Sequence, residues 1–116
     1  IDKIKECKFL FESAGSTASP RIVTESMALD LPVLLYHNIV GGWKYINSNT
    51  GEFFYDIEDF EQNLILLREK YDKYEPRKYI EKYYGVNKSS KKLLDFVNKV
   101  YPELKLTEKK YIKFAV

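Results

Sequence analysis

The apolar run at residues 32–36 limits the possible folds of this chain most strongly. It reads Pro-Val-Leu-Leu-Tyr, and a polar loop follows it. A strand with one face in water alternates polar and apolar residues, whereas a strand covered on both faces of a parallel sheet is apolar throughout. We therefore expect an α/β fold with a buried strand at residues 32–36.

A second strand and a helix are expected upstream of this run. The apolar residues near positions 8–12 suit a buried strand, and a loop of small residues follows them. Ser19 and Pro20 are typical of a helix start, because a serine oxygen can accept from the free first-turn amides and a proline at the first helical position loses no hydrogen bond. The helix should run from about residue 20 to 29, giving the strand, helix, strand order of a parallel crossover.

The remainder of the chain is predicted to be mostly helical. Apolar residues at spacings of three and four from residue 57 on indicate an amphipathic helix, with Asp56 placed to cap it. The other expected elements are a short edge strand at residues 52–55, a helix from Pro76 to Gly85, a helix at about 89–100, and a tail or last strand at 104–116.

The bulk composition narrows the class of protein. At 116 residues the chain is one domain or part of one, and its opening residues lack the pattern of a signal peptide, so we interpret it as a piece of a longer chain. No apolar run approaches the roughly 20 residues of a membrane span. Cys7 and His37 are the only cysteine and histidine, which excludes an intrachain disulfide and a zinc site of Cys and His ligands. We expect a reducing, cytoplasmic setting.

The loop and helix start at residues 12–21 have the layout of a phosphate site. The amides of a first helical turn are unpaired, and the helix dipole is positive there. Small residues allow close approach of a ligand, hydroxyls can donate, and a guanidinium can add charge: here these are Gly15, Ser16, Thr17, Ala18, Ser19 and Arg21. Any strand, loop and helix junction needs similar residues, so a purely structural role stays open.

Other single residues also have two interpretations. Glu25 is either a solvated helix glutamate or a carboxylate that accepts hydrogen bonds from two neighbouring sugar hydroxyls. His37 is either a structural hydrogen-bonder or a proton-transfer group whose partner is not evident. Gly41 and Gly42 can form a simple turn, and the aromatic residues that follow them can belong to the core.

Nucleic-acid binding is a weaker hypothesis for the more basic C-terminal half. Lysine and tyrosine interleave at residues 68–85, and such a pattern can track phosphates and stack bases. Acidic residues interrupt the run throughout, and the tyrosine spacing suits helix packing. The net charge of +2 is also small, so we do not expect a nucleic-acid partner.

The order of motifs along the chain resembles the C-terminal lobe of GT-B fold glycosyltransferases of the glycogen-synthase-like, group 1 retaining class. Four segments carry the resemblance: ESMALDLPVLL, VGGWKYI, NTGEFF and DIEDFEQNLILLRE. In that family a Glu-Ala-Met-Ala helix precedes a Pro-Val-Val strand, a Gly-Gly loop, a Thr-Gly turn and an acidic helix start. The resemblance covers about residues 5–100.

The resemblance implies specific roles for the loop and the helix. The family carries two glutamates eight positions apart, of which the second holds the ribose hydroxyls and corresponds to Glu25. The first, near the transferred sugar, falls at Thr17, whose hydroxyl cannot replace the charge of a carboxylate, so the sugar is held differently or this member is altered or inactive. The donor-binding residues would be Gly15, Ser16, Ala18, Ser19, Arg21 and Glu25, with Thr17 at the catalytic position. The Gly-Gly loop would pack behind this site.

The function implied is transfer of a sugar from a nucleoside diphosphate sugar to a sugar, lipid or protein acceptor, with no metal ion or other cofactor. Residues 1–75 would be the final part of the Rossmann-like nucleotide-sugar-binding lobe, and residues 76–116 would be C-terminal helices and a tail. An N-terminal lobe of the same chain would complete the site, so these residues alone should not catalyse. The alternative is a degenerate, noncatalytic lobe that serves as an interaction or assembly module.

Overall fold

The computed structural model describes residues 2–16 and 20–107, which form an α/β fold. They divide between two compact units, Ile1–Lys82 and Tyr83–Val116. The elements, in chain order, are α1 (Asp2–Lys5), β1 (Leu10–Glu12), α2 (Arg21–Ala28), β2 (Val33–Tyr36), η1 (Trp43–Tyr45), β3 (Gly51–Phe54), α3 (Ile57–Lys70), η2 (Tyr71–Lys73), α4 (Pro76–Tyr83), α5 (Val86–Val100) and η3 (Pro102–Leu104). Among the described residues, none of the helices has the length and apolar character needed to cross a membrane.

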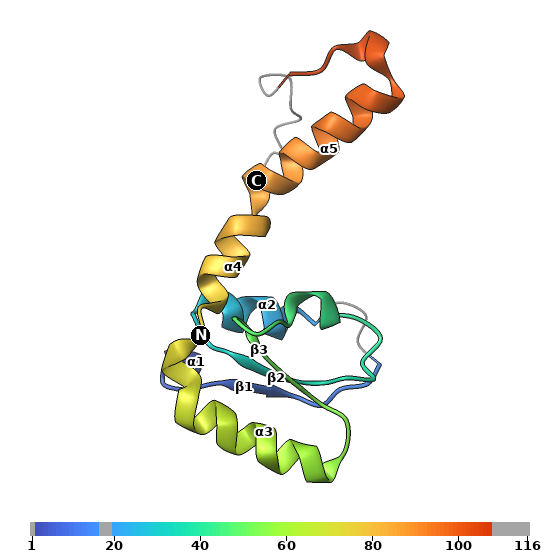
Figure 1. The fold of residues 1–116 in the computed structure, drawn as a ribbon. Coiled ribbons are helices and arrows are strands. Elements are labelled where there is room, and N and C mark those ends of the chain that lie inside the picture. The colour runs from blue at the N-terminus through green and yellow to red at the C-terminus, as the bar shows by residue number, and fades with distance from the viewer. Residues whose placement is uncertain (1, 17–19, 108–116) are drawn as a thin grey trace. The chain divides into compact units, whose positions relative to one another are not determined.

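The three strands form a parallel sheet in the order β1-β2-β3. Val33, Leu34 and Leu35 of the central strand have no exposed surface, which confirms the prediction of a strand covered on both faces. The short strand predicted near residues 52–55 is β3, at one edge of the described sheet. Figure 1 shows α2 on one face of the sheet and α3 on the other, the arrangement that buries both faces of β2.

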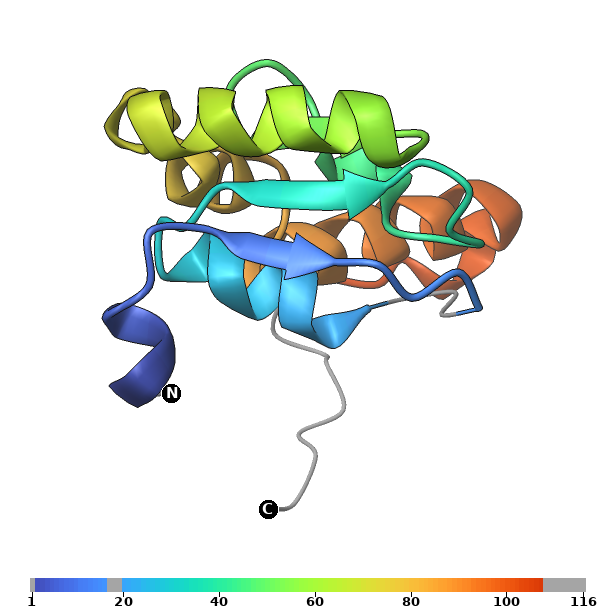
Figure 2. The ribbon, with the colours of Figure 1, turned by 90° about the horizontal axis from the view of Figure 1, so that it is seen from below.

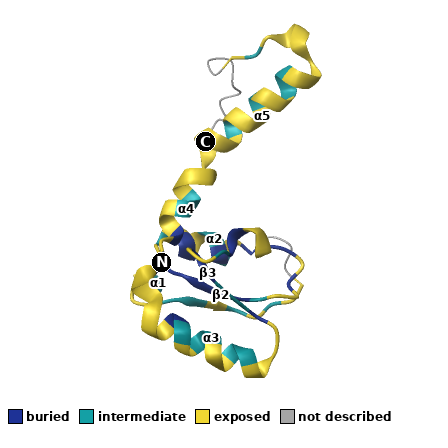
Figure 3. Cartoon of the chain, viewed as in Figure 1, coloured by how far each residue is buried: buried dark blue, intermediate teal, exposed yellow. Residues whose placement is uncertain are grey.

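One cluster of the hydrophobic core lies on the face of the sheet toward α3. Leu34, Phe54, Leu67 and Tyr74 form a buried cluster, and Phe60 and Leu64 of α3 pack against it. The spacing of Phe60, Leu64 and Leu67 places them on one side of the helix. The period seen in the sequence thus corresponds to the packed side of α3, and Figure 3 shows the buried residues concentrated in the strands and the helix sides that face them.

The start of α3 is fixed by a capping box, as the sequence predicted for Asp56. Its carboxylate accepts from the amides of Glu58 and Asp59, at 2.9 and 3.0 Å. Asp59 reaches back and accepts from the amides of Asp56 and Tyr55, at 3.0 and 2.9 Å. The hydrogen bond from the Asp56 amide is the main reason that the pKa of Asp59 lies below its usual value.

The start of α2 differs from the sequence prediction. Pro20 is the residue before the helix rather than its first member, with an extended backbone (φ −70°, ψ 103°), and the helix begins at Arg21. The predicted cap Ser19 lies outside the described residues. Val23 and Met27 are fully buried and form the apolar side of this helix. Asp30, at φ +66°, ends it by leaving the right-handed region.

The helix α4 begins at Pro76, as predicted from the restriction that proline imposes on Glu75. Two contacts hold it within the first unit: the Arg77 amide donates to Asp30 Oδ1 at 3.1 Å, and the Tyr79 hydroxyl donates to the Lys44 carbonyl at 3.3 Å. The first unit extends to Lys82. The functional boundary between residues 75 and 76 stays a prediction.

In the second unit, α5 begins at Val86, three residues earlier than expected. Gly85, at φ +109°, changes the chain direction just before it, and no capping side chain marks this start in the sequence. After η3, Leu106 exchanges two hydrogen bonds with the Asn98 side chain, both at 2.9 Å. Residues 104–107 are not a strand, and the rest of the predicted tail or strand lies outside the described residues.

A buried tyrosine and a glutamate link β3 to the segment after α3. The hydroxyl of Tyr74 donates to Glu52 Oε1 at 2.7 Å, and Tyr74 is only 8% exposed. Burial, together with this hydrogen bond and the negative charge of Glu52, raises the pKa of Tyr74 well above its usual value. The neutral phenol is therefore the form that the folded state favours.

Tyr74→Phe is expected to lower the free energy of unfolding by about 1.5 kcal/mol near neutral pH, because Glu52 loses its donor. In the unfolded chain the phenol ionises at about pH 10, while the folded chain retains the proton, so this contribution is lost as pH rises above about 10. Urea unfolding at a series of pH values should show that the free energy of unfolding falls less steeply above about pH 10 in the variant than in the parent. Tyr71→Phe, which alters an exposed ring, should keep the parent's slope. Parallel slopes for Tyr74→Phe and the parent would contradict this assignment.

Candidate functional site

The carboxyl ends of the three parallel strands define one edge of the sheet. Figure 2 shows the arrowheads of β1 and β2 pointing to the same side. The loop at residues 13–20 follows β1, and the longer connection at 37–50 follows β2. In open α/β sheets ligands bind outside this edge, so a ligand site is expected at these two connections.

The two connections contact each other at the start of α2. The Val40 amide donates to the Gly15 carbonyl at 3.1 Å. Gly42 has φ +88°, and a Cβ at this position would lie 2.7 Å from Cγ and 3.0 Å from Cδ of Pro20. A side chain at this position would force Gly42 or Pro20 to shift, so glycine permits the close packing of the two connections. The position of the Gly-Gly loop behind a donor site stays an expectation.

The described part of the β1–α2 loop is open to solvent. Gly15 and Ser16 are exposed, and a Cβ on Gly15 would meet no described atom within 4 Å. Glu12 Oε1 accepts from the Ala14 amide at 2.7 Å and so fixes the path of the chain as it leaves β1. This role of Glu12 was not predicted from the sequence. A carboxylate directly after an apolar run can indicate a side chain that binds a nearby backbone amide.

Three of the predicted site residues cannot be placed. Thr17, Ala18 and Ser19 lie outside the described residues, so their predicted roles are untested. The predicted catalytic position, the predicted helix cap and one of the small residues expected near the diphosphate are therefore still expectations from the sequence.

The exposed side of α2 carries two opposite charges. Arg21 and Glu25 are both exposed and four positions apart, which places them on one side of the helix. Neither side chain has an ion pair or hydrogen bond with another residue in the described ranges 2–16 and 20–107. The amides of Arg21 and Ile22 likewise have no described partner, whereas the Val23 amide donates to the Pro20 carbonyl. The helix start therefore presents a cation, a carboxylate and two first-turn amides that have no partner among the described residues.

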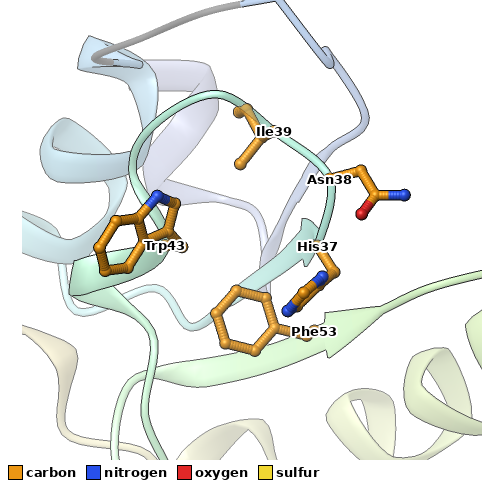
Figure 4. Close-up of a pocket in the computed structure, with 5 residues that line it drawn as sticks. All are labelled: His37, Asn38, Ile39, Trp43 and Phe53. Atoms are coloured by element: carbon orange, nitrogen blue, oxygen red, sulfur yellow. The ribbon is translucent and has the colours of Figure 1, made fainter.

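A pocket of about 480 Å³ is formed by residues of the connection after β2 and by one residue of β3. We call it the aromatic pocket, and Figure 4 shows its lining residues: His37, Asn38, Ile39, Trp43 and Phe53. The pocket was not predicted from the sequence. The sequence offered a place in the core for the aromatic residues after Gly42. Trp43 is 58% exposed, so that interpretation is wrong for it. Tyr45 is only 9% exposed and is a core residue.

Aromatic contacts hold His37 in place. Its ring stacks on Tyr55, with centroids 4.3 Å apart and an interplanar angle of 29°, and meets Phe53 edge to face at 5.4 Å. Its ring nitrogens have no hydrogen-bond partner within the described part of the chain. The structure therefore shows a packing role for the ring and no described carboxylate to orient it as a proton-transfer group.

Comparison with family models, curated proteins and solved structures gave no match to the chain. Among the described residues, no group of three or more His, Cys, Asp or Glu side chains is placed to hold a metal ion. The site is accordingly defined by this chain's own geometry: the start of α2 with Arg21 and Glu25, the loop at Gly15, and the aromatic pocket.

Proposed function

We propose that this chain is the donor-binding lobe of a glycosyltransferase that transfers a sugar from a nucleoside diphosphate sugar to an acceptor. The observation that carries the proposal is the start of α2, where Arg21 and Glu25 share one exposed side of the helix with no described partner. This helix begins at the carboxyl edge of a parallel sheet, and the motif order resembles that of the glycosyltransferase lobe.

Each group at the helix start suits one part of the donor. The Glu25 carboxylate can accept hydrogen bonds from both ribose hydroxyls of the nucleotide. Arg21, the amides of the first turn and the positive end of the helix dipole favour the diphosphate. As the bond to the sugar breaks, negative charge grows on the departing diphosphate, and fixed donors stabilise that charge without rearranging.

The loop geometry fits this role. Gly15 has open space where a side chain would be, and its conformation imposes no need for glycine. The loop therefore leaves room for the donor to approach the backbone. A cytoplasmic setting, in keeping with the single exposed thiol of Cys7, belongs to the proposal. The acceptor would be a sugar, lipid or protein, and an N-terminal lobe of the same chain would complete the site.

A second candidate function follows from Thr17, which stands where the resembled family has its first glutamate. A threonine hydroxyl lacks the charge that a carboxylate would place near the transferred sugar. On this alternative the chain is a noncatalytic lobe retained for interaction or assembly.

The test is a thermal-shift screen of the full-length protein against UDP, GDP, ADP and their common sugar conjugates. A ligand that binds the native state raises apparent stability according to its affinity, by about 2.7 kcal/mol at a concentration a hundred times its dissociation constant. We expect one nucleotide class to raise the melting temperature, its sugar conjugates included. A well-folded protein that responds to none of them would favour the noncatalytic module.

A further inference from the structure

We propose that the aromatic pocket binds a neutral sugar ring of the acceptor, so that the acceptor is a glycan or a glycosylated molecule. The inference rests on the proposed function. It assigns a chemical class to the acceptor, which is the second substrate of that function. Three features of the aromatic pocket support it: the residues that line it, its volume, and its position on the connection that contacts the loop at Gly15.

The lining supplies an apolar surface that suits the face of a sugar ring. Trp43 is 58% exposed, Phe53 is half-buried, and Ile39 is 4% exposed. Figure 4 shows Trp43, Phe53 and Ile39 as three of the residues that line the aromatic pocket. A hexopyranose has C–H bonds on its ring faces and hydroxyls at its edge, so one face can cover an indole that is otherwise in water.

One polar group adjoins this surface in a fixed orientation. The contacts of His37 with Tyr55 and Phe53 set the plane of its ring. A neutral imidazole offers one donor and one acceptor, both of which a sugar hydroxyl can use. Asn38 lies at the rim and donates to the Tyr36 hydroxyl at 3.3 Å, and Figure 4 shows its amide turned away from Trp43. We therefore assign no ligand contact to Asn38.

The charge of the lining favours a neutral ligand over a nucleotide. The five lining residues include no carboxylate, lysine or arginine. The neighbouring cation, Lys44, has its Nζ 5.0 Å from the centroid of the Tyr45 ring. A phosphate here would lack the cations that phosphate sites use. The volume of about 480 Å³ lies within the range of roughly 300–1,000 Å³ typical of small-molecule sites, which suits a small saccharide.

The position of the aromatic pocket links it to the donor site. Its lining residues Ile39 and Trp43 flank the segment in which Val40 bonds to Gly15 and Gly42 packs on Pro20. A sugar held in the aromatic pocket would thus sit on the connection that contacts the donor loop. Transfer between two bound substrates requires that their sites be adjacent.

Saturation-transfer NMR on the full-length protein with a panel of neutral disaccharides tests the proposal, with UDP, GDP and ADP as competitors. We expect saturation to reach the protons of one sugar face most strongly. A change in tryptophan emission on titration that is absent from Trp43→Phe reports on the aromatic pocket. The nucleotides should not displace the sugar.

Variants of one residue locate the binding. Trp43→Ala should weaken disaccharide binding by at least about tenfold, as loss of an aromatic anchor does, and Trp43→Phe should retain part of it. Tyr71→Ala, at an exposed aromatic outside the aromatic pocket, should bind as the parent does. Dispersed amide spectra will show that each variant is folded. Absence of saturation for every sugar, unchanged binding in Trp43→Ala, or displacement by nucleotides would each overturn the proposal.

The result can be separated from that of the donor screen. Disaccharide binding at Trp43 together with stabilisation of the full-length protein by a nucleotide sugar supports both proposals. Stabilisation by a nucleotide sugar without saccharide binding refutes the aromatic pocket and leaves the proposed function intact. Saccharide binding by a protein that no nucleotide sugar stabilises overturns the transferase function, and the acceptor role falls with it.

Discussion

Gly51→Ala should destabilise the first unit by about 3 kcal/mol, because the new Cβ would overlap the backbone of the neighbouring strand. It would lie inside contact distance of the Val33 carbonyl oxygen, 2.8 Å from the Val33 nitrogen and 2.9 Å from its carbonyl carbon. Backbone atoms cannot rotate aside as a side chain can. The two strands would have to separate where Val33 pairs with Gly51 and where the Val33 amide donates to the Thr50 carbonyl.

Thermal unfolding measures this effect, and we expect the midpoint to fall by more than about 10 °C. The matched control is Gly15→Ala, since a Cβ there meets no described atom within 4 Å. It should unfold within a few degrees of the parent. An equal, small change in both variants would show that the close approach of Gly51 to Val33 is not a constraint on the fold.

The sequence contained the information for the three strands and for most helices. The unbroken apolar run of β2 and the spacing of three and four in α3 are local patterns, and each corresponds to the observed element. Capping by Asp56 is local as well, because the groups that it binds are two and three residues away. Patterns of this kind can be recognised in the sequence because the interacting residues are close together along the chain.

The misjudged positions depend on residues far apart in the chain. Gly51 was interpreted as part of a turn, yet it is the first residue of β3, and its lack of a side chain matters because of Val33. Trp43 was considered for the core because large aromatics are usually buried. Its exposure follows from the path of the connection between β2 and β3, which no local pattern specifies.

The candidate site was predictable only in part for the same reason. The start of α2 was placed within one residue, so Arg21 and Glu25 could be put on one side of a helix from their spacing alone. The aromatic pocket joins residues 37–43 to Phe53, which the pairing of β2 with β3 brings alongside. This pairing joins residues eighteen positions apart, such as Leu35 and Phe53, and single-sequence periodicity does not reveal it.

Glu25→Gln is expected to abolish stabilisation of the full-length protein by its nucleotide-sugar donor. The amide keeps the size of the side chain but loses the negative charge and one of the two acceptor oxygens, so it cannot accept from the two ribose hydroxyls with separate oxygens. Loss of a charged, two-point contact corresponds to about a hundredfold in dissociation constant. The fold should be unaffected, because Glu25 is exposed and has no partner among the residues described.

Calorimetric titration of donor into parent and variant measures this loss. Glu61→Gln makes the same chemical change at an exposed position of α3, on the opposite face of the sheet, and should bind donor as the parent does. Donor affinity that survives in Glu25→Gln would remove the ribose role of Glu25. Equal losses in the two variants would instead point to a general effect of charge on donor approach, because only a direct contact can distinguish one exposed glutamate from another.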